Sequence, residues 1–489
     1  MPFRRGETDA NAKRNPFLEM KRFPSYVLPV PDANRQRLCN GWLLLAVASL
    51  VLSGLFAVLI VLSRMPYIGD VFPWVDFFQV ALVVHVDLSV LVWLLAFAGV
   101  FWSVTSGARV LPLAWAGLAL ALAGTLVITA SPFLGAGPAI MNNYVPVLDS
   151  PLFLTGLFLF GLGFTAMVVF GFIAAKPLGR PVDGASALRF GGHTALVASA
   201  LAVVALAWTY LEIPRHLEGA AYYESFFWGG GHVIQFTFTQ LMLVAWLWLA
   251  GAAGLRVPMT PRVVVGLLLL GLLPAFATPL IHLAHEVVTF QYRQAMTAMM
   301  VFGGGLAALP IGLALVVALA RGGTEAAATA VPRHSLLATL WLSIALFGVG
   351  GVLGFLITES NVIVPAHYHG SITAVTLAFM GLTYHLLPEL GYRRPHERLV
   401  VLQPYVYGVG QLVHVLGLAW SGGHGVQRKT AGVDQGLEGV AEIVGMAVMG
   451  LGGLVAVTGG ALYLVVVLLS VRHGRATGGS DLASQQPNG

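Results

Sequence analysis

Residues 364–388, VPAHYHGSITAVTLAFMGLTYHLLP, form an apolar stretch that carries His367 and His369 close to one end. A hydrocarbon core of about 30 Å needs roughly 20 apolar residues in a helix, so this stretch is long enough to cross a membrane. Ionisable side chains inside a membrane are costly unless they pair or bind something. Residues two apart on a helix project to nearly opposite sides, so the two imidazoles can ligate two metals that flank one helix.

The rest of the chain has the composition of a polytopic membrane protein. Of its 489 residues, 57% are hydrophobic and 10% are charged, and the mean hydropathy is +0.82. A soluble domain with a water-covered surface could not sustain these values. We predict an all-α membrane bundle of about twelve helices in a single domain, with a basic tail (1–38), a core (40–471) and a polar tail (477–489). The expected spans are 40–64, 76–104, 109–134, 151–175, 187–212, 225–252, 262–290, 294–320, 333–358, 364–388, 398–421 and 437–471.

Positive charge alternates between the loops and predicts the orientation. Beyond the basic N-terminal tail, the cations of every second loop are Arg109, then Lys176 and Arg180, Arg256 and Arg262, Arg321 and Arg333, Arg393, Arg394 and Arg398, and Arg472 and Arg475. Short loops rich in Lys and Arg stay cytoplasmic, so both termini are expected there, in a cytoplasmic membrane of bacterial or archaeal type. The net charge of +5 follows from this topology and gives no reason to expect nucleic acid binding.

Cysteine usage limits the redox chemistry that this chain can carry alone. Cys39 is the single cysteine. One thiol excludes an internal disulfide, a covalent CxxCH haem site and a dinuclear copper centre built on two cysteines. Cofactors held by histidine, with electrons supplied by another molecule, therefore remain the expected chemistry.

Four expected helices place histidines at one depth. The side chains concerned are His85, His232, His285 with its neighbour Glu286, and the pair His367 and His369. At 1.5 Å per residue, all of them fall within roughly the outer third of the membrane. A lone histidine in such a helix is often a hydrogen-bonded packing residue, and His193, His385 and His414 are interpreted in that way.

The motifs around these residues resemble the catalytic subunit of the haem–copper oxidoreductase superfamily, which includes oxygen reductases and nitric oxide reductases. The resemblance covers essentially the whole chain and includes HVDLSV, WGGGHVIQF, HLAHE and AHYHG. It implies three pseudo-symmetric arcs of helices. It also implies that His85 and His369 hold a low-spin haem, that His367 holds a high-spin haem, and that His232 and His285 hold a non-haem metal. We expect both haems to be of b type.

The same resemblance assigns a role to the basic pair Arg428 and Lys429, which lies on the expected outer side, against the positive-inside trend. In the family, such a pair contacts haem propionates. Bonds from guanidinium or ammonium groups to carboxylates are among the stronger polar contacts in a partly dry site.

One departure from the oxidase pattern concerns the metal. The position after His285, usually a second histidine, is Glu286. Two histidines and one carboxylate form the arrangement preferred by non-haem iron, so iron is expected rather than copper. Two alternatives stay open: His282, one turn before His285, can supply a third imidazole, or Glu286 is an interfacial carboxylate at a helix end. Gln235, one turn beyond His232, is a candidate hydrogen-bond partner for a metal-bound ligand.

A second departure concerns the reaction. Oxygen reductases of the family use a tyrosine on the sixth or seventh helix as an electron source, but Phe236 lies four residues after His232, and residues 225–252 and 262–290 contain no tyrosine. The nearest, Tyr292, follows at the outer end. Coupling two NO molecules into N2O needs only two electrons, so a nitric oxide reductase is the predicted function. The alternatives are an oxygen reductase of unusual ligand set and a non-enzymatic haem electron conduit or gas sensor.

Protons and electrons must both be delivered to such a site. The expected spans contain no lysine, and Ile234 stands where many oxidases carry a glutamate. Entry from outside past Glu212, Glu224, Glu286 and His282 is therefore expected. The expected electron donor is a partner subunit, a soluble cytochrome c or cupredoxin, or quinol.

Overall fold

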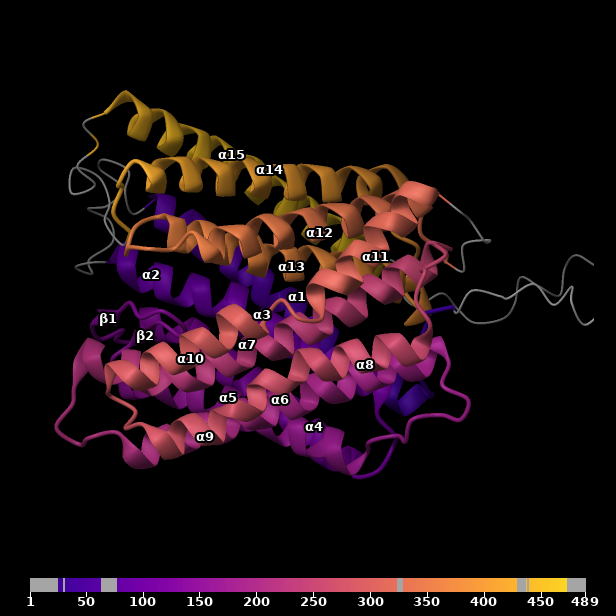
Figure 1. Ribbon diagram of the computed structural model, residues 1–489, viewed down its shortest axis with the longest axis horizontal. Helices are drawn as coiled ribbons and strands as arrows, with labels where there is room; N and C mark the ends of the chain where they lie inside the picture. Colours follow the sequence, from indigo (N-terminus) through magenta and orange to yellow (C-terminus); the bar gives the residue numbers. More distant parts are fainter. Residues whose placement is uncertain are drawn as a thin grey trace, which may run out of the picture.

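The computed structural model describes residues 25–29, 31–62, 77–322, 329–428, 437 and 439–472. Twelve spans in the described part are long and apolar enough to cross a membrane, which confirms the predicted bundle. They run side by side along the long axis of the molecule (Figure 1). The helices are α1 (Ala33–Leu62), α2 (Phe77–Val86), α3 (Trp93–Thr105), α4 (Leu111–Ala130), α5 (Pro151–Ile173), α6 (Gly184–Glu212), α7 (Gly219–Ala252), α8 (Pro261–Leu272), α9 (Ala277–Ala284), α10 (Phe290–Gly303), α11 (Ala308–Arg321), α12 (Arg333–Phe355), α13 (Ile363–Glu389), α14 (Glu397–Gly423) and α15 (Val440–Arg472).

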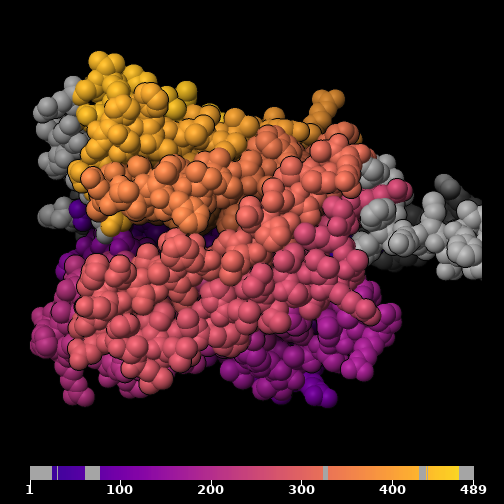
Figure 2. Space-filling model, in the orientation of Figure 1, coloured from indigo at the N-terminus to yellow at the C-terminus, as the bar shows by residue number. Residues whose placement is uncertain are grey.

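The helices that carry the predicted ligands form the centre of the bundle. The most apolar windows of α7 and α13 are 89% buried and that of α2 to α3 is 67% buried, whereas no other span exceeds 50%. α8 and the helices that follow it cover most of the face shown in Figure 2. A buried helix surrounded by other helices can hold a cofactor away from lipid, so these three positions suit the predicted site.

The second span is interrupted directly after His85. The π-helical turn η3 (Asp87–Val92) separates α2 from α3. Such turns are rare in proteins and are frequent at functional sites, because the extra residue changes the direction of the side chains around it. Asp87 is 1% exposed, and neither of its carboxylate oxygens has a hydrogen-bond partner among the described residues.

The seventh span departs from the predicted range of 262–290. The 3-10 turn η5 (Leu273–Phe276), which contains Pro274, separates α8 from α9. The helix then ends at Ala284, because His285 is extended, with φ −141° and ψ 136°. The Thr289 hydroxyl accepts a hydrogen bond from the Tyr292 amide and caps α10. His285 and Glu286 therefore lie in a connection between helices.

A short hairpin follows the third span and the 3-10 turn η4 (Ser131–Phe133). Strands β1 (Ala139–Ile140) and β2 (Val147–Leu148) pair antiparallel, with Ala139 opposite Leu148. The Asn142 side-chain oxygen accepts hydrogen bonds from the amides of Tyr144 (3.0 Å) and Val145 (2.9 Å). This Asx turn gives the tip of the hairpin a defined shape. Figure 1 shows the hairpin at the left end of the bundle.

Candidate cofactor and metal centre

His85 on α2, predicted to share a haem with His369 on α13, has its ring anchored on α1. The His85 Nδ1 donates a hydrogen bond to the Ser53 carbonyl at 2.9 Å. Fixing Nδ1 on a carbonyl sets the tautomer and leaves Nε2 with a lone pair for a metal.

His414 packs against His369 and is hydrogen-bonded to the backbone, as expected of the packing residue predicted from the sequence. Its ring meets that of His369 at 4.7 Å, nearly edge to face. Its Nδ1 donates to the Met449 carbonyl at 2.9 Å. A histidine whose spacing along the chain matches no motif cannot be linked to a site before the helices are packed.

His367 projects to another side of α13, against α12. Its Nδ1 donates to the Gly350 carbonyl at 2.7 Å, so its Nε2 is also left for a metal. A side chain at Gly354 would begin 2.8 Å from the same Nδ1, which is closer than real contacts allow. Glycine at this position is therefore needed for the ring to lie where it does.

The surroundings of these ligands fit a bulky group. From Ala374 to Leu387 every residue of α13 is buried, but His367, Tyr368 and His369 all keep exposed surface. Tyr368 is 42% exposed on the helix that is otherwise among the most buried in the bundle. Close packing normally leaves few voids inside a protein. His367 and His369 thus remain partly exposed on an otherwise buried helix, so their rings are accessible to a group that binds from outside the packed core.

His232 is held on α7 in the same manner. It is 4% exposed, and its Nδ1 donates to the Trp228 carbonyl one turn earlier at 2.8 Å. The Tyr144 hydroxyl lies beside both ring nitrogens, 2.8 Å from Nδ1 and 3.0 Å from Nε2. The Thr297 hydroxyl lies 3.3 Å from Nε2. Since Nδ1 gives its proton to the Trp228 carbonyl, Nε2 is the ring nitrogen that can accept a hydrogen bond.

Tyr144, at the tip of the hairpin, is the residue that sequence reasoning missed. A side chain at Gly231 would overlap the Tyr144 ring, so the last glycine of WGGGH makes room for it. The ring also packs edge to face on Trp228 at 5.8 Å. Burial, with a smaller contribution from the Glu224 charge, raises the pKa of the Tyr144 hydroxyl and keeps it protonated as a donor.

Arg428 fastens the hairpin to the bundle. It donates to the Ser360 hydroxyl at 2.9 Å and to the Asn143 side-chain oxygen at 3.1 Å. Asn143 in turn donates from its backbone and side-chain nitrogens to the Glu224 carboxylate. The predicted propionate partner thus ties the hairpin to the connection that precedes α13. Lys429, the other predicted partner, lies outside the described residues.

The structure does not gather His285 and Glu286 with His232. His285 is half-buried and Glu286 is exposed. Within the described ranges, no group of three His, Cys, Asp or Glu side chains is close enough to hold a metal ion. Gln235 donates to the Gly231 carbonyl at 3.3 Å, within its own helix.

His282 forms a second histidine–tyrosine pair. It is 4% exposed, its Nδ1 donates to the Thr278 carbonyl at 3.0 Å, and its Nε2 lies 3.0 Å from the Tyr292 hydroxyl. A side chain at Gly229 would overlap that hydroxyl. Gly229 and Gly231, two apart on α7, therefore admit two tyrosines on nearly opposite sides of the helix.

The predicted outer carboxylates make separate contacts. Glu212 accepts a hydrogen bond from the Trp208 indole at 2.6 Å, and Glu224 binds the hairpin through Asn143. Glu286 is exposed in the turn that precedes α10. The structure thus links none of the three to another.

Comparisons with known proteins identify the family and the fold. The model of the family described as Cytochrome C and Quinol oxidase polypeptide I matches residues 38–456. A Rickettsia prowazekii protein, described as uncharacterized, is 26% identical over 501 residues, covering 89% of this chain and 96% of the relative. An Aquifex aeolicus protein, described in the same way, is 29% identical over 374 residues, covering 72% and 85%. A heme-copper terminal oxidase dimer solved by cryo-EM has a similar fold, with a TM-score of 0.66 and 16% identity over 90% of this chain and 84% of that one.

Proposed function

We propose that this chain, which belongs to the family of Cytochrome C and Quinol oxidase polypeptide I, reduces nitric oxide to nitrous oxide. Membership of the family makes it a multi-pass membrane oxidoreductase of the terminal oxidase type. Two NO molecules, two electrons and two protons give one N2O and one water. A haem and a neighbouring non-haem metal supply the two electrons when bound.

The observation that carries the haem part of the proposal is the shared anchoring of the ligands. His85 and His367 each give their Nδ1 proton to a backbone carbonyl. The His369 ring packs nearly edge to face on that of His414 at 4.7 Å. We propose that His85 and His369 hold a low-spin haem b and that His367 holds a high-spin haem b, at the two sides of α13.

The choice of NO is supported by the residues available for redox chemistry. Beyond His232, α7 continues to Ala252 with no tyrosine, and the position one turn on is Phe236. We further propose that the non-haem metal is iron and that His232, whose Nδ1 is fixed on the Trp228 carbonyl, is one of its ligands. His285 and Glu286 lie in a connection between helices and do not form a group of three with His232, so the structure does not support them as its other ligands.

Oxygen reduction is the second candidate, and Tyr144 is the observation that favours it. Its hydroxyl lies 3.0 Å from the Nε2 of His232. A phenol at that distance can give a hydrogen atom, which is one electron and one proton, to a group bound near the histidine. Cleavage of the O–O bond takes four electrons, so a donor of this kind supports oxygen reduction. The hairpin thus supplies from a distant segment a tyrosine that the helix lacks.

Turnover of the purified, reduced protein with NO and separately with O2 distinguishes the two, alongside iron and copper analysis. Fast N2O formation, with iron in excess of the two haems, supports the proposal. Fast O2 reduction with copper present contradicts it. A Tyr144→Phe variant keeps the ring and removes the hydroxyl, so it should abolish O2 reduction but leave most NO reduction. Two six-coordinate haems without either turnover would instead indicate an electron conduit or gas sensor.

The expected electron donor is a partner subunit, a soluble cytochrome c or cupredoxin, or quinol, in a cytoplasmic membrane of bacterial or archaeal type. The single cysteine supports an external donor, because this chain cannot build a thiolate copper centre of the two-cysteine kind.

A further inference from the structure

One of the predicted haem ligands lacks the backbone anchor that the others have. His85 and His367 each give their Nδ1 proton to a backbone carbonyl. No hydrogen bond joins the ring of His369 to a described residue. Its ring contacts are with Tyr368, its neighbour along the chain, and with His414. A histidine that ligates a metal is normally oriented by a partner of its other ring nitrogen. His369 therefore depends on neighbouring rings for its orientation.

His414 is itself held firmly by α15. Its Nδ1 donates a hydrogen bond to the Met449 carbonyl at 2.9 Å. The two helices pack closely here, because a side chain at Gly452 would overlap the His414 backbone, and one at Gly453 would begin 3.1 Å from the His414 Nδ1. On its other side the ring meets that of His369 at 65° between the ring planes, with 4.7 Å between the centroids. A ring fixed on α15 thus contacts a ligand-bearing side chain of α13.

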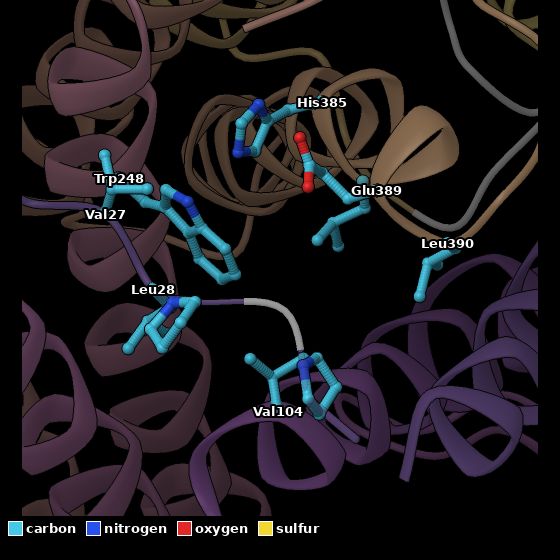
Figure 3. A pocket seen from close by; sticks show the side chains of 10 residues that line it. Val27, Leu28, Val104, Trp248, His385, Glu389 and Leu390 are labelled. Atoms are coloured by element: carbon cyan, nitrogen blue, oxygen red, sulfur yellow. The ribbon is translucent and has the colours of Figure 1, made fainter. Parts of the chain in front are cut away.

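A further histidine of α13, His385, makes a ring contact of the same kind at the opposite end of the helix. It is 3% exposed, and its ring meets that of Trp248 nearly edge to face at 5.9 Å. Figure 3 shows the Glu389 carboxylate beside this ring, at the wall of a cavity of about 210 Å³. The described residues that line this cavity include none of the predicted haem ligands. His385 therefore provides a matched comparison for His414.

We propose that His414 is a positioning residue for His369, and that its ring sets the orientation in which the His369 imidazole meets the low-spin haem. The inference rests on the proposed assignment of that haem to His85 and His369. The hydrogen bond to Met449 keeps the His414 ring from turning, and the edge-to-face contact passes this constraint to His369. Loss of a partner that orients a metal ligand typically lowers metal affinity by about 10–100-fold.

Variants of the His414 ring test the contact directly. The readout is the EPR spectrum of the oxidised, purified protein, because the g values of a low-spin haem with two imidazole ligands depend on the angle between the ligand planes. His414→Leu removes the ring, so it should shift these g values and speed the loss of this haem to a haem-scavenging apoprotein about 10-fold or more. His414→Phe keeps an aromatic ring and should stay close to the parent. His385→Leu is the matched control and should change neither readout.

A second pair of variants leaves every ring in place, so the inference stays testable even where His414→Leu does not fold. Gly453→Ala begins a side chain 3.1 Å from the His414 Nδ1, so that ring has to give by a few tenths of an ångström. The same g values should shift in the same direction as in His414→Leu, by a smaller amount. Gly450→Ala, three residues earlier in α15, meets nothing within 4 Å and should leave them unchanged.

The outcomes separate this inference from the haem assignment on which it rests. A parent protein without the EPR signal of a haem with two imidazole ligands overturns the assignment, and the inference with it. A parent that has the signal, with the same g values in His414→Leu and Gly453→Ala, overturns the inference alone. An equal shift in His385→Leu also overturns it, because the loss of any buried histidine ring of this kind would then have the same effect.

Discussion

Replacing Gly231 with alanine tests whether the Tyr144 ring lies against α7. The three nearest atoms to the added methyl group belong to that ring, and even the third is only 2.7 Å away. Contacts below 3.0 Å are essentially never seen, so the ring must retreat. Overpacking of this kind costs about 1–3 kcal/mol. Retreat also breaks the hydrogen bond of 3.0 Å from the hydroxyl to His232.

Gly230→Ala is the matched control, because it adds the same methyl group one residue earlier in the same helix. There the nearest atoms, the Ala202 carbonyl oxygen and the Leu206 Cβ, are 3.3 Å away. Alanine in place of glycine inside a helix stabilises by about 1 kcal/mol in either variant. The difference between the two variants removes this gain and should be about 1–3 kcal/mol, with Gly231→Ala the less stable.

The measurement is the free energy of unfolding in detergent micelles, in the parent protein and in a Tyr144→Ala background. Removing the ring leaves room for the methyl group, so Gly231→Ala should lose most of its cost in that background. Neighbouring residues that share a contact are expected to be non-additive in this way. An equal cost with and without the ring would refute the packing of Tyr144 on α7.

Two further predictions concern local contacts. Gly354→Ala places a methyl group 2.8 Å from the His367 Nδ1 and should weaken retention of the haem that we propose His367 holds, read from the spectrum of the purified protein. Gly351→Ala meets nothing within 4 Å and should not. Asp183 caps α6, and hydrogen bonds from Ser186 hold the pKa of its carboxylate below the usual value. Asp183→Ala should therefore cost about 0.5–2 kcal/mol of unfolding free energy at neutral pH. That difference should shrink as the pH falls through the lowered pKa, because the stabilisation exists only while the carboxylate is ionised; a pH-independent difference would contradict it.

The helices and the ligand-bearing face of α13 could be predicted because both depend on local patterns. Apolar length defines a span regardless of its neighbours, and all twelve predicted spans have counterparts in the structure. The spacing of His367 and His369 on one helix already places them on different sides.

Tyr144 could not be predicted, because its position depends on a hairpin that folds back over the end of the bundle. The spans predicted to carry His232 and His285, residues 225–252 and 262–290, contain no tyrosine. The hairpin is held by side chains far away in the sequence, among them Glu224 and Arg428. No pattern within residues 139–150 indicates that its tip enters the bundle.

The glycines of WGGGH also show which features follow from a local sequence pattern and which depend on the fold. Their presence indicates that something approaches α7 closely, and the sequence suggests a macrocycle or a neighbouring helix. In the structure each glycine leaves room for a different neighbour. Gly229 faces the Tyr292 hydroxyl, Gly230 faces helix α6, and Gly231 faces the Tyr144 ring. His232, which follows them, is therefore fixed by its own helix at Nδ1, and the Tyr144 hydroxyl lies beside both of its ring nitrogens. A metal that bound Nε2 would have to displace the Tyr144 hydroxyl from that nitrogen or bind beside it. Tyr144 would then lie next to any ligand of the metal.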